Sequence, residues 1–193
     1  LRAILRAATS GDVRIMFPMI SSLAELQQAR EHLEAVKVEL QEEGVPHRAD
    51  LPVGIMVETP SAALSADLLA EEVDFFSIGT NDLVQYLMAV DRNNELIADL
   101  YQEFHPAVLR AIKHTIDTGH EHGLWVGMCG EMAGDEIAIP VLLGLGLDEF
   151  SMSASSILKA REQISQLSKS EMAAHSEAIL SLATADEVKA YVE

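Results

Sequence analysis

The chain contains the segment Asp74-Phe75-Phe76-Ser77-Ile78-Gly79-Thr80-Asn81-Asp82, an apolar run of strand character that ends in a polar turn. Four further runs of this kind occupy residues 13–17, 52–57, 124–128 and 149–152. Most of these runs are nearly continuous in apolar residues, which is typical of strands covered on both faces of a parallel sheet. We therefore predict five parallel strands, with residues 74–78 as the third.

Helical patterns lie between these strands. Residues 22–43 form the clearest one, because Ser22 and Glu25 make a capping box and Gly44 closes the helix. Further helices are predicted at residues 61–71, 83–90 and 106–123, after the fourth strand, and from residue 155 onward. A second capping box, formed by Thr184 and Glu187, lies near the end of the chain.

Alternating strands and helices indicate an α/β fold in which right-handed crossovers join parallel strands. Two architectures fit this pattern: a doubly wound sheet, or the later strands of a (β/α)8 barrel of the TIM type. A complete barrel usually takes eight strands and about 250 residues. Five strands in 193 residues are too few for a complete barrel, and the pattern alone leaves both architectures open.

Composition narrows the class of protein. With 49% hydrophobic and 23% charged residues, residues 1–193 are expected to fold as a single domain. A net charge of −18 argues against binding nucleic acid, although a bound cation could still allow an anionic metabolite. We find neither a signal peptide nor an apolar stretch long enough to insert into a membrane, so we expect a cytoplasmic protein. The chain starts within a helical pattern at Leu1, as expected for a piece of a longer protein.

Polar residues follow the predicted strands where ligands bind to parallel sheets. Glu58 follows the second strand directly, and Asp82 follows the Gly-Thr-Asn turn after the third. Hard oxygen ligands without a cysteine cluster suit Mg²⁺, or Mn²⁺, better than zinc. We predict a metal site made by these two carboxylates. In the alternative interpretation, Glu58 pairs with a basic residue and Asp82 caps the helix that begins at Leu83.

Asn81 and Arg92 are predicted to lie beside this site. The guanidinium of Arg92 is permanently charged and can bind phosphate oxygens through two hydrogen bonds, which makes it the best anion ligand of the segment. The alternative for Arg92 is a surface ion pair with Asp91 or Glu95. Arg14, in the first strand, points either into the barrel or onto a helix.

Cys129 is the one cysteine of the chain, and Glu131 follows it two residues later. Near carboxylates and an anionic substrate, a thiol has a raised pKa and stays protonated, which suits a general acid better than a nucleophile. The seven histidines fall in predicted helices or loops, and we predict surface or helix-terminal roles for them.

Several segments together closely resemble enzyme I, the phosphoenolpyruvate–protein phosphotransferase family of the bacterial sugar phosphotransferase system. The resemblance covers nearly the whole chain and rests on Arg14-Ile15-Met16-Phe17-Pro18-Met19, Gly54-Ile55-Met56-Val57-Glu58-Thr59-Pro60, the segment from Asp74 to Leu83, Gly127-Met128-Cys129-Gly130-Glu131 and residues 146–153. It implies the later strands of a phosphoenolpyruvate-binding (β/α)8 barrel.

The resemblance also implies a role for each site residue. Glu58 and Asp82 ligate Mg²⁺, Asn81 and Arg92 hold the phosphate of phosphoenolpyruvate, and Cys129, with Glu131 nearby, protonates C3 of the enolate to give pyruvate. In this family the phosphoryl group passes to a histidine on a separate N-terminal domain, which is absent from this chain, and then to the carrier HPr. A homodimer is also implied. We expect that the chain alone cannot complete phosphotransfer.

Two alternatives also fit the sequence. Pyruvate phosphate dikinase and phosphoenolpyruvate synthase share the barrel and have both motifs in looser form, but the stretch from Gln85 to Arg92 looks more like enzyme I. A noncatalytic dimerisation or regulatory module could also retain the barrel. The simultaneous presence of Glu58, Asp82, Arg92 and Cys129 argues against that module.

Overall fold

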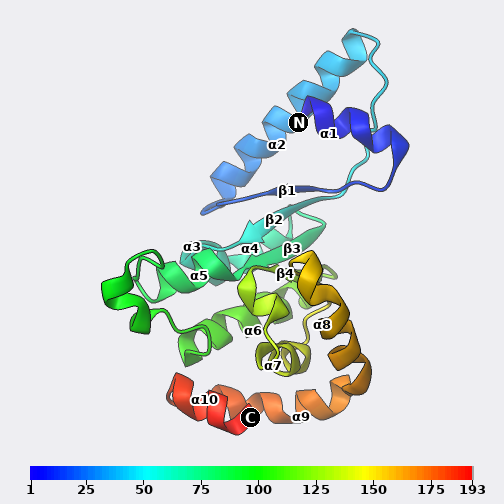
Figure 1. Cartoon of the computed structure of the whole chain (residues 1–193). Coiled ribbons are helices and arrows are strands. Elements are labelled where there is room, and N and C mark those ends of the chain that lie inside the picture. Colours follow the sequence, from blue (N-terminus) through cyan, green and yellow to red (C-terminus); the bar gives the residue numbers. More distant parts are fainter. Residues whose placement is uncertain (193) are drawn as a thin grey trace.

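The computed structural model describes residues 1–192, and within them one five-stranded sheet forms the centre of the molecule (Figure 1). All neighbouring strands are parallel. The strands are β1 (Ile15–Phe17), β2 (Val53–Val57), β3 (Phe75–Gly79), β4 (Trp125–Cys129) and β5 (Glu149–Ser151). Each predicted strand is therefore present, with its bounds shifted by at most two residues.

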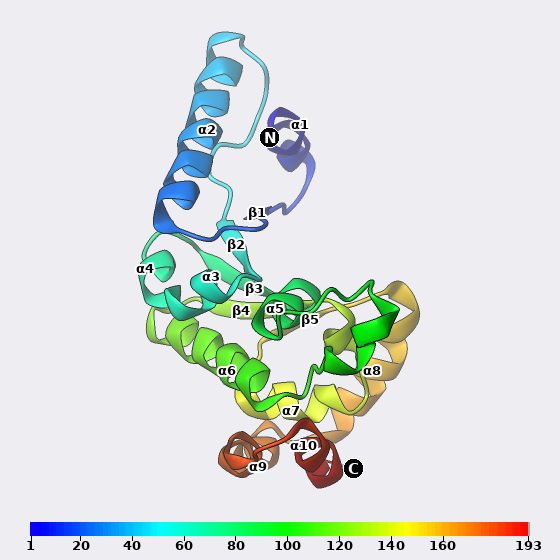
Figure 2. The same cartoon turned by 90° about the vertical axis from the view of Figure 1, so that its left-hand side faces the viewer.

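The order of the strands distinguishes the two architectures. Across the described residues the order is β1-β2-β3-β4-β5, so each strand pairs with the strand that follows it in the chain. A doubly wound sheet reverses its order at a switch point, whereas a barrel adds each strand beside the previous one. The sheet therefore has the winding of a (β/α)8 barrel. Figure 2 shows the strands following one another across the molecule in this order.

Helices connect the strands and extend beyond them, with α1 and α2 at one end of the molecule and α9 and α10 at the other (Figure 1). The α-helices are α1 (Arg2–Ala7), α2 (Leu23–Glu42), α3 (Pro60–Leu64), α4 (Ala66–Ala70), α5 (Thr80–Leu87), α6 (Pro106–Glu121), α7 (Ala138–Leu145), α8 (Ala154–Gln166), α9 (Lys169–Ser181) and α10 (Ala185–Val192). Short 3-10 helices are η1 (Ala8–Ser10), η2 (Glu95–Leu100) and η3 (Glu131–Gly134).

Two helix predictions need correction. The single helix predicted for residues 61–71 is wrong, because Ser65 leaves helical geometry with φ −111° and ψ 27° and separates α3 from α4. The helix predicted to begin at Leu83 begins three residues earlier, at Thr80, with Gly79 as its N-cap. Asp82 therefore lies inside the first turn of α5, and the interpretation of Asp82 as the capping residue is wrong.

The two predicted capping boxes differ in detail. Thr184 and Glu187 form both hydrogen bonds, since Glu187 N–H donates to Thr184 Oγ1 and Thr184 N–H donates to Glu187 Oε2. Ser22 accepts from the N–H of Glu25, but the Glu25 carboxylate accepts from the N–H and hydroxyl of Ser21 instead of from Ser22. One reciprocal bond of that box is thus shifted by a residue.

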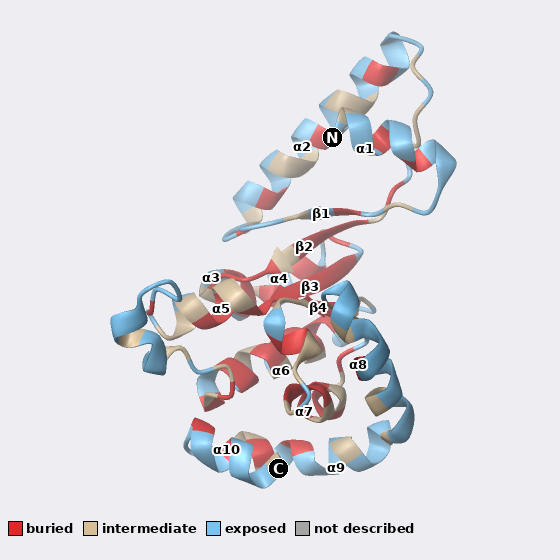
Figure 3. Cartoon of the chain, viewed as in Figure 1, coloured by how far each residue is buried: buried red, intermediate tan, exposed pale blue. Residues whose placement is uncertain are grey.

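One face of the sheet is buried under α3–α7, and Figure 3 shows the burial concentrated in the central strands and the facing sides of these helices. The sheet contributes Ile55, Val57, Phe76, Ile78, Val126 and Met128 to this core. A smaller cluster joins α1 and α2 to β1 and β2 through Leu5, Ile15, Leu33, Leu40 and Val53. At about 25 cal/mol per Å² of apolar area, this burial is the main force that holds the helices on the sheet.

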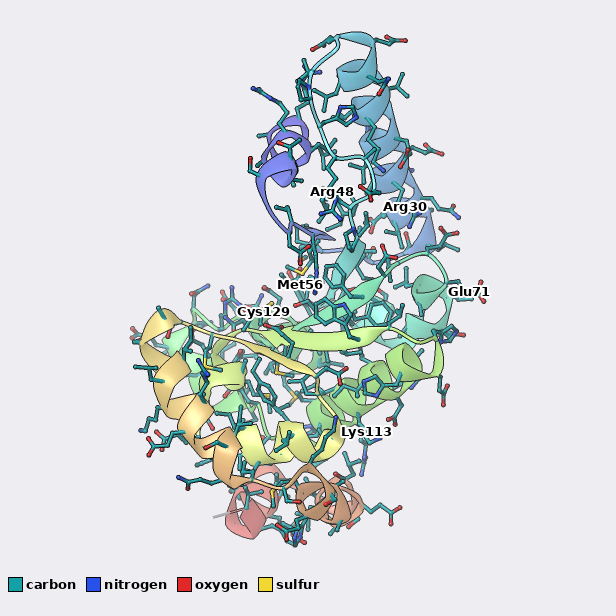
Figure 4. The ribbon with its side chains drawn as sticks, turned by 90° about the vertical axis from the view of Figure 1, so that its right-hand side faces the viewer. Arg30, Arg48, Met56, Glu71, Lys113 and Cys129 are labelled. Carbon is teal, nitrogen blue, oxygen red and sulfur yellow. The ribbon has the colours of Figure 1, made fainter. Side chains whose placement is uncertain are left out.

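The opposite face of the sheet carries the residues of the other parity. Figure 4 shows Met56 and Cys129 on this face, away from Glu71 on the α4 side and Lys113 on α6. Met16 on the same face is 37% exposed. Near the amino ends of the strands, the guanidinium carbon of Arg14 lies 4.9 Å from the centre of the Trp125 ring. The Arg14 side chain therefore lies on this inner face of the sheet and not against a helix. Within residues 1–192, no helix combines the length and apolar character that crossing a membrane requires.

Candidate functional site

The carboxyl end of the sheet brings the predicted site residues from β2, β3 and β4 together. Gly79 pairs with Cys129, and Cys129 pairs with Ser151. A Cβ on Gly79 would lie 2.8 Å from Glu58 Oε2, so the Glu58 side chain lies directly over Gly79. Because Gly79 lacks a side chain, the carboxylate of Glu58 can extend over Gly79 toward Cys129, the partner of Gly79 on the neighbouring strand.

Glu58 is a buried carboxylate, only 3% exposed. Its Oε1 accepts a hydrogen bond of 2.7 Å from the N–H of Met19, which has the unusual positive φ of 56°. Burial raises the pKa of Glu58, and the neighbouring Asp82 carboxyl raises it further. No basic side chain pairs with Glu58 among the described ion pairs, so the alternative of a simple salt bridge is not what the structure shows.

Asp82 and Arg92 face each other beside Glu58. Arg92 Nη1 lies 3.4 Å from Asp82 Oδ1, with side-chain exposures of 38% and 29%. The N–H of Arg92 donates to the Gln85 side chain, which ties the end of this segment back to α5. Arg92 therefore pairs with Asp82, and not with Asp91 or Glu95. It lies at the carboxylate pair, where the sequence analysis expected an anion ligand.

Asn81 links the end of β3 to the turn after β4. Its side-chain Oδ1 accepts from the N–H of Glu131 at 3.1 Å, which orients the amide nitrogen away from that turn. Its carbonyl accepts from the hydroxyl of Tyr101 at 3.3 Å. Burial raises the pKa of Tyr101 to about 12, so this hydroxyl stays protonated and donates at neutral pH. Asn81 is thus held from two sides.

Cys129 is half-buried, and its Sγ accepts a hydrogen bond of 3.6 Å from the hydroxyl of Ser77. Burial raises the pKa of the thiol, the Ser77 bond lowers it, and the carboxylates of Glu58 and Glu149 raise it. The net direction is upward, so the thiol is protonated at neutral pH. This is the protonation state that a general acid requires.

A cavity of 430 Å³ opens beside Cys129, between the ends of β4 and β5, η3 and the start of α8. Its volume is within the range of small-molecule sites, roughly 300–1,000 Å³. Glu131 is exposed and lines this cavity together with Cys129, Ser151 and Ser153. The carboxylates that influence the thiol are Glu58 and Glu149, so Glu131 shares the cavity with Cys129 without being its main charged neighbour.

Four contacts were missed by the sequence analysis, and they come from Ser77, Thr80, Tyr101 and the N–H of Met19. Ser77 could have been found from the sequence, because it is a polar residue in an apolar strand and lies on the same face of the sheet as Gly79. Thr80 lies in the Gly-Thr-Asn turn before Asp82, and Met19 lies in a segment quoted for its resemblance, but no role was predicted for either residue. Tyr101 lies in an irregular stretch after η2, where no pattern indicates its direction.

The carboxylate pair suits a magnesium-type ion. Glu58 and Asp82 supply hard oxygen donors that repel each other, and a divalent cation between them would relieve that repulsion. Within residues 1–192, no group of three or more His, Cys, Asp or Glu side chains is arranged to hold a metal. Mg²⁺ typically takes one or two carboxylates and completes its shell with water and substrate phosphate oxygens. Two carboxylates are therefore enough for Mg²⁺, which does not need a site enclosed by protein ligands alone.

A parallel sheet with barrel winding that collects carboxylates, an arginine and a thiol at the carboxyl ends of its strands has the edge at which (β/α) barrels bind ligands. The family profile described as "PEP-utilising enzyme, PEP-binding domain" matches residues 1–169. The chain belongs to this family of phosphoenolpyruvate-binding domains.

Curated relatives extend the similarity over the whole chain. Proteins named phosphoenolpyruvate-protein phosphotransferase from Priestia megaterium and Bacillus subtilis (strain 168) are each 58% identical over all 193 residues. A protein of the same name from Listeria monocytogenes is 55% identical over the same length. The match covers 100% of this chain and 34% of each relative, so the chain spans about a third of their length.

A solved structure supports the fold at greater distance. The citrate lyase from Burkholderia xenovorans LB400 superposes with a TM-score of 0.60 at 19% sequence identity, covering 98% of this chain and 64% of that one. At this identity the likeness concerns the α/β barrel fold alone.

Proposed function

We propose that this chain is the phosphoenolpyruvate-binding part of a phosphoenolpyruvate–protein phosphotransferase. In a protein of the relatives' length, the phosphoryl group would pass from phosphoenolpyruvate to a histidine outside this chain and then to the carrier HPr, with release of pyruvate. The observation that carries the proposal is the arrangement of Glu58, Gly79 and Cys129, in which a buried carboxylate and a protonated thiol lie on either side of a residue without a side chain.

Glu58 and Asp82 would hold Mg²⁺, with Mn²⁺ as a second fit. When bound, the ion neutralises charge on the transferring phosphoryl group. Arg92 would bind phosphate oxygens from the same side, since its guanidinium already lies 3.4 Å from Asp82. The amide nitrogen of Asn81 would donate to the substrate, because the amide oxygen is engaged by Glu131. Charge complementarity and positioning are the main contributions that phosphoryl transfer needs from a protein.

Cys129 would supply the proton. The bond between phosphorus and the enol oxygen of phosphoenolpyruvate breaks as the acceptor histidine attacks phosphorus, and the electron pair stays on the oxygen as the enolate of pyruvate. The S–H bond of Cys129 then breaks, C3 takes the proton, and the resulting thiolate is reprotonated by solvent. A raised thiol pKa keeps the proton available until the enolate forms.

Three of the seven histidines make contacts away from the site. His120 bonds Asp148, His105 caps α6, and His175 bonds the hydroxyl of Tyr191. These contacts support the view that the acceptor histidine is not among them. The homodimer implied by the resemblance is part of the same proposal, and Leu96, which is 93% exposed in η2, is a candidate contact for it.

A chimera tests the proposal. The chain replaces the matching third of the Bacillus subtilis relative, to which it is 58% identical, and pyruvate formation from phosphoenolpyruvate is followed with HPr and Mg²⁺. We expect Cys129→Ala and Asp82→Ala to lower the rate by about 10²-fold or more, as loss of general-acid or metal contributions usually does. Asp67→Asn, on the exposed side of α4, is the matched control. If both site variants transferred phosphoryl to HPr at the parent rate, the assignment would be wrong.

A further inference from the structure

The turn Cys129-Gly130-Glu131 is held on both sides by two consecutive residues of α5. Thr80 Oγ1 donates a hydrogen bond of 3.3 Å to the carbonyl of Cys129. Asn81 Oδ1 accepts a hydrogen bond of 3.1 Å from the N–H of Glu131. The two peptide groups that flank Gly130 are therefore each fixed by a side chain from β3–α5, about fifty residues earlier in the chain.

Gly130 shows how close this contact is. Its φ of 114° and ψ of 177° belong to a region that essentially only glycine adopts. A Cβ at Gly130 would lie 2.3 Å from Thr80 Oγ1 and 2.9 Å from Asn81 Oδ1. The Thr80 hydroxyl thus occupies the space that any side chain at Gly130 would need.

Thr80 itself is 0% exposed, and its hydroxyl is spent on the Cys129 carbonyl. It is therefore placed behind the turn, where it does not line the cavity beside the thiol. Leaving a buried hydroxyl without a hydrogen-bond partner costs folding free energy. The bond to the Cys129 carbonyl therefore holds the Thr80 side chain in one position.

We propose that Thr80 is a positioning residue for the thiol of Cys129. Its hydroxyl fixes the peptide plane after Cys129 and, through it, the direction in which the Cys129 side chain faces the cavity and the hydroxyl of Ser77. The proposal rests on the proposed function for its catalytic consequence, but the link between Thr80 and the thiol is a property of this chain alone.

Alkylation measures that link without any turnover. Cys129 is the one cysteine of the chain, so iodoacetamide reports on a single thiol. Thr80→Val keeps the shape of the side chain and removes the hydroxyl, whereas Thr80→Ser keeps the hydroxyl. We expect Thr80→Val to speed alkylation of the folded chain about threefold to tenfold, as loss of one hydrogen bond loosens the turn. We expect Thr80→Ser to stay within about twofold of the parent.

Thr80→Ala serves as the second variant without a hydroxyl should Thr80→Val fail to fold, with the fold checked by circular dichroism and urea titration. A merely structural role would lower the urea midpoint and leave the alkylation rate of the folded protein unchanged. That result for both variants without a hydroxyl would overturn the proposal.

The chimera separates this proposal from the proposed function. We expect Thr80→Val to lower kcat for pyruvate formation about tenfold and to leave KM for phosphoenolpyruvate within about twofold of the parent. Thr80→Ser, which keeps the hydroxyl, should keep the kcat of the parent. An equal change in kcat and KM, or none, would refute a positioning role. If the parent chimera formed no pyruvate while alkylation still depended on the Thr80 hydroxyl, the proposed function would fail and the link between Thr80 and Cys129 would stand.

Discussion

The hydroxyl of Ser77 donates a hydrogen bond to the thiol of Cys129 across neighbouring strands, with 3.6 Å between oxygen and sulfur. The two residues belong to β3 and β4 and lie on the face of the sheet that carries the site. The bond stabilises the thiolate relative to the thiol and so opposes the effect of burial on the Cys129 pKa.

Removing this bond is expected to raise the pKa of Cys129 further. In Ser77→Ala, burial and the carboxylates of Glu58 and Glu149 remain, while the one contribution from a side chain that lowers the pKa is lost. Titration of thiolate absorbance near 240 nm measures the change, and alkylation at pH 8 should slow roughly twofold to tenfold. Ser77→Thr keeps a hydroxyl and serves as the control. A lower thiol pKa in Ser77→Ala would contradict this account, and the slower alkylation contrasts with the faster alkylation expected for Thr80→Val.

Neutralising Glu58 is expected to stabilise the chain while removing its response to Mg²⁺. The folded-state pKa of Glu58 lies above its ordinary value, so the native state holds its proton to higher pH than the unfolded state does. The stability contributed by this group is therefore full below the ordinary glutamate pKa, about 4.3, and is lost as pH rises through the folded value. Glu58→Gln should lack this loss and melt at a higher temperature than the parent at pH 7.

The metal arm of the same experiment uses thermal unfolding with and without Mg²⁺. At a tenfold excess over Kd, binding to the native parent adds about 1.4 kcal/mol, which raises Tm by roughly 3–6 °C for a chain of this size. Glu58→Gln should show no such rise, whereas Glu121→Gln, an exposed position at the end of α6, should behave like the parent. An equal rise in Glu58→Gln would exclude Glu58 as a ligand.

Much of the fold was predictable, because continuous apolar runs and helix signals are local. The predicted strand at residues 74–78 appears as Phe75–Gly79, and the placement of Glu58 and Asp82 at neighbouring strand ends followed from parallel pairing. The choice between a doubly wound sheet and a barrel was not predictable from the pattern, because strand order depends on pairing between distant segments. The break at Ser65 also escaped, since the Ala-rich stretch around it favours a continuous helix.

The second set of contacts around the site was harder to predict for the same reason. Thr80 contacts the carbonyl of Cys129 forty-nine residues away, and Tyr101 contacts Asn81 from an irregular segment. Such contacts depend on how the β3–α5 turn sits against the β4–η3 turn. Residue types alone indicated which chemistry the site could perform, whereas the three-dimensional arrangement shows which residues hold it in place.

Adding one methyl group to Gly130 should be much more costly than adding it to Gly123. Both glycines have a positive φ, 114° and 75°, so alanine is strained at either position. At Gly123 nothing lies within 4 Å of the added Cβ, and we expect a loss of about 1–2 kcal/mol. At Gly130 the backbone lies in a region that essentially only glycine adopts, and the Cβ would also clash with Thr80 Oγ1, so the loss should exceed that at Gly123 by about 1–3 kcal/mol. Urea unfolding measures both variants, and equal losses would show that the Thr80 contact adds no steric constraint.

Asp148 fastens the amino-terminal edge of the sheet, opposite the site, and its removal should make the chain less stable at neutral pH. Its Oδ2 accepts from the N–H of Val126 at 2.9 Å and lies 2.7 Å from Nε2 of His120. Burial alone would raise the pKa of Asp148, but the Val126 and His120 bonds outweigh it and hold the pKa below its usual range. Stability from such a group is present above the ordinary aspartate pKa, about 3.9, and is lost as pH falls through the lower folded value.

Asp148→Asn should therefore lower Tm at pH 7 by roughly 2–4 °C, about 1 kcal/mol for a partly exposed charged bond, and the difference from the parent should shrink on acidification. Thermal unfolding between pH 3 and pH 7 measures it, with the exposed Asp67→Asn as control. A difference that did not shrink below the ordinary aspartate pKa would mean that the charge of Asp148 is not what stabilises this edge.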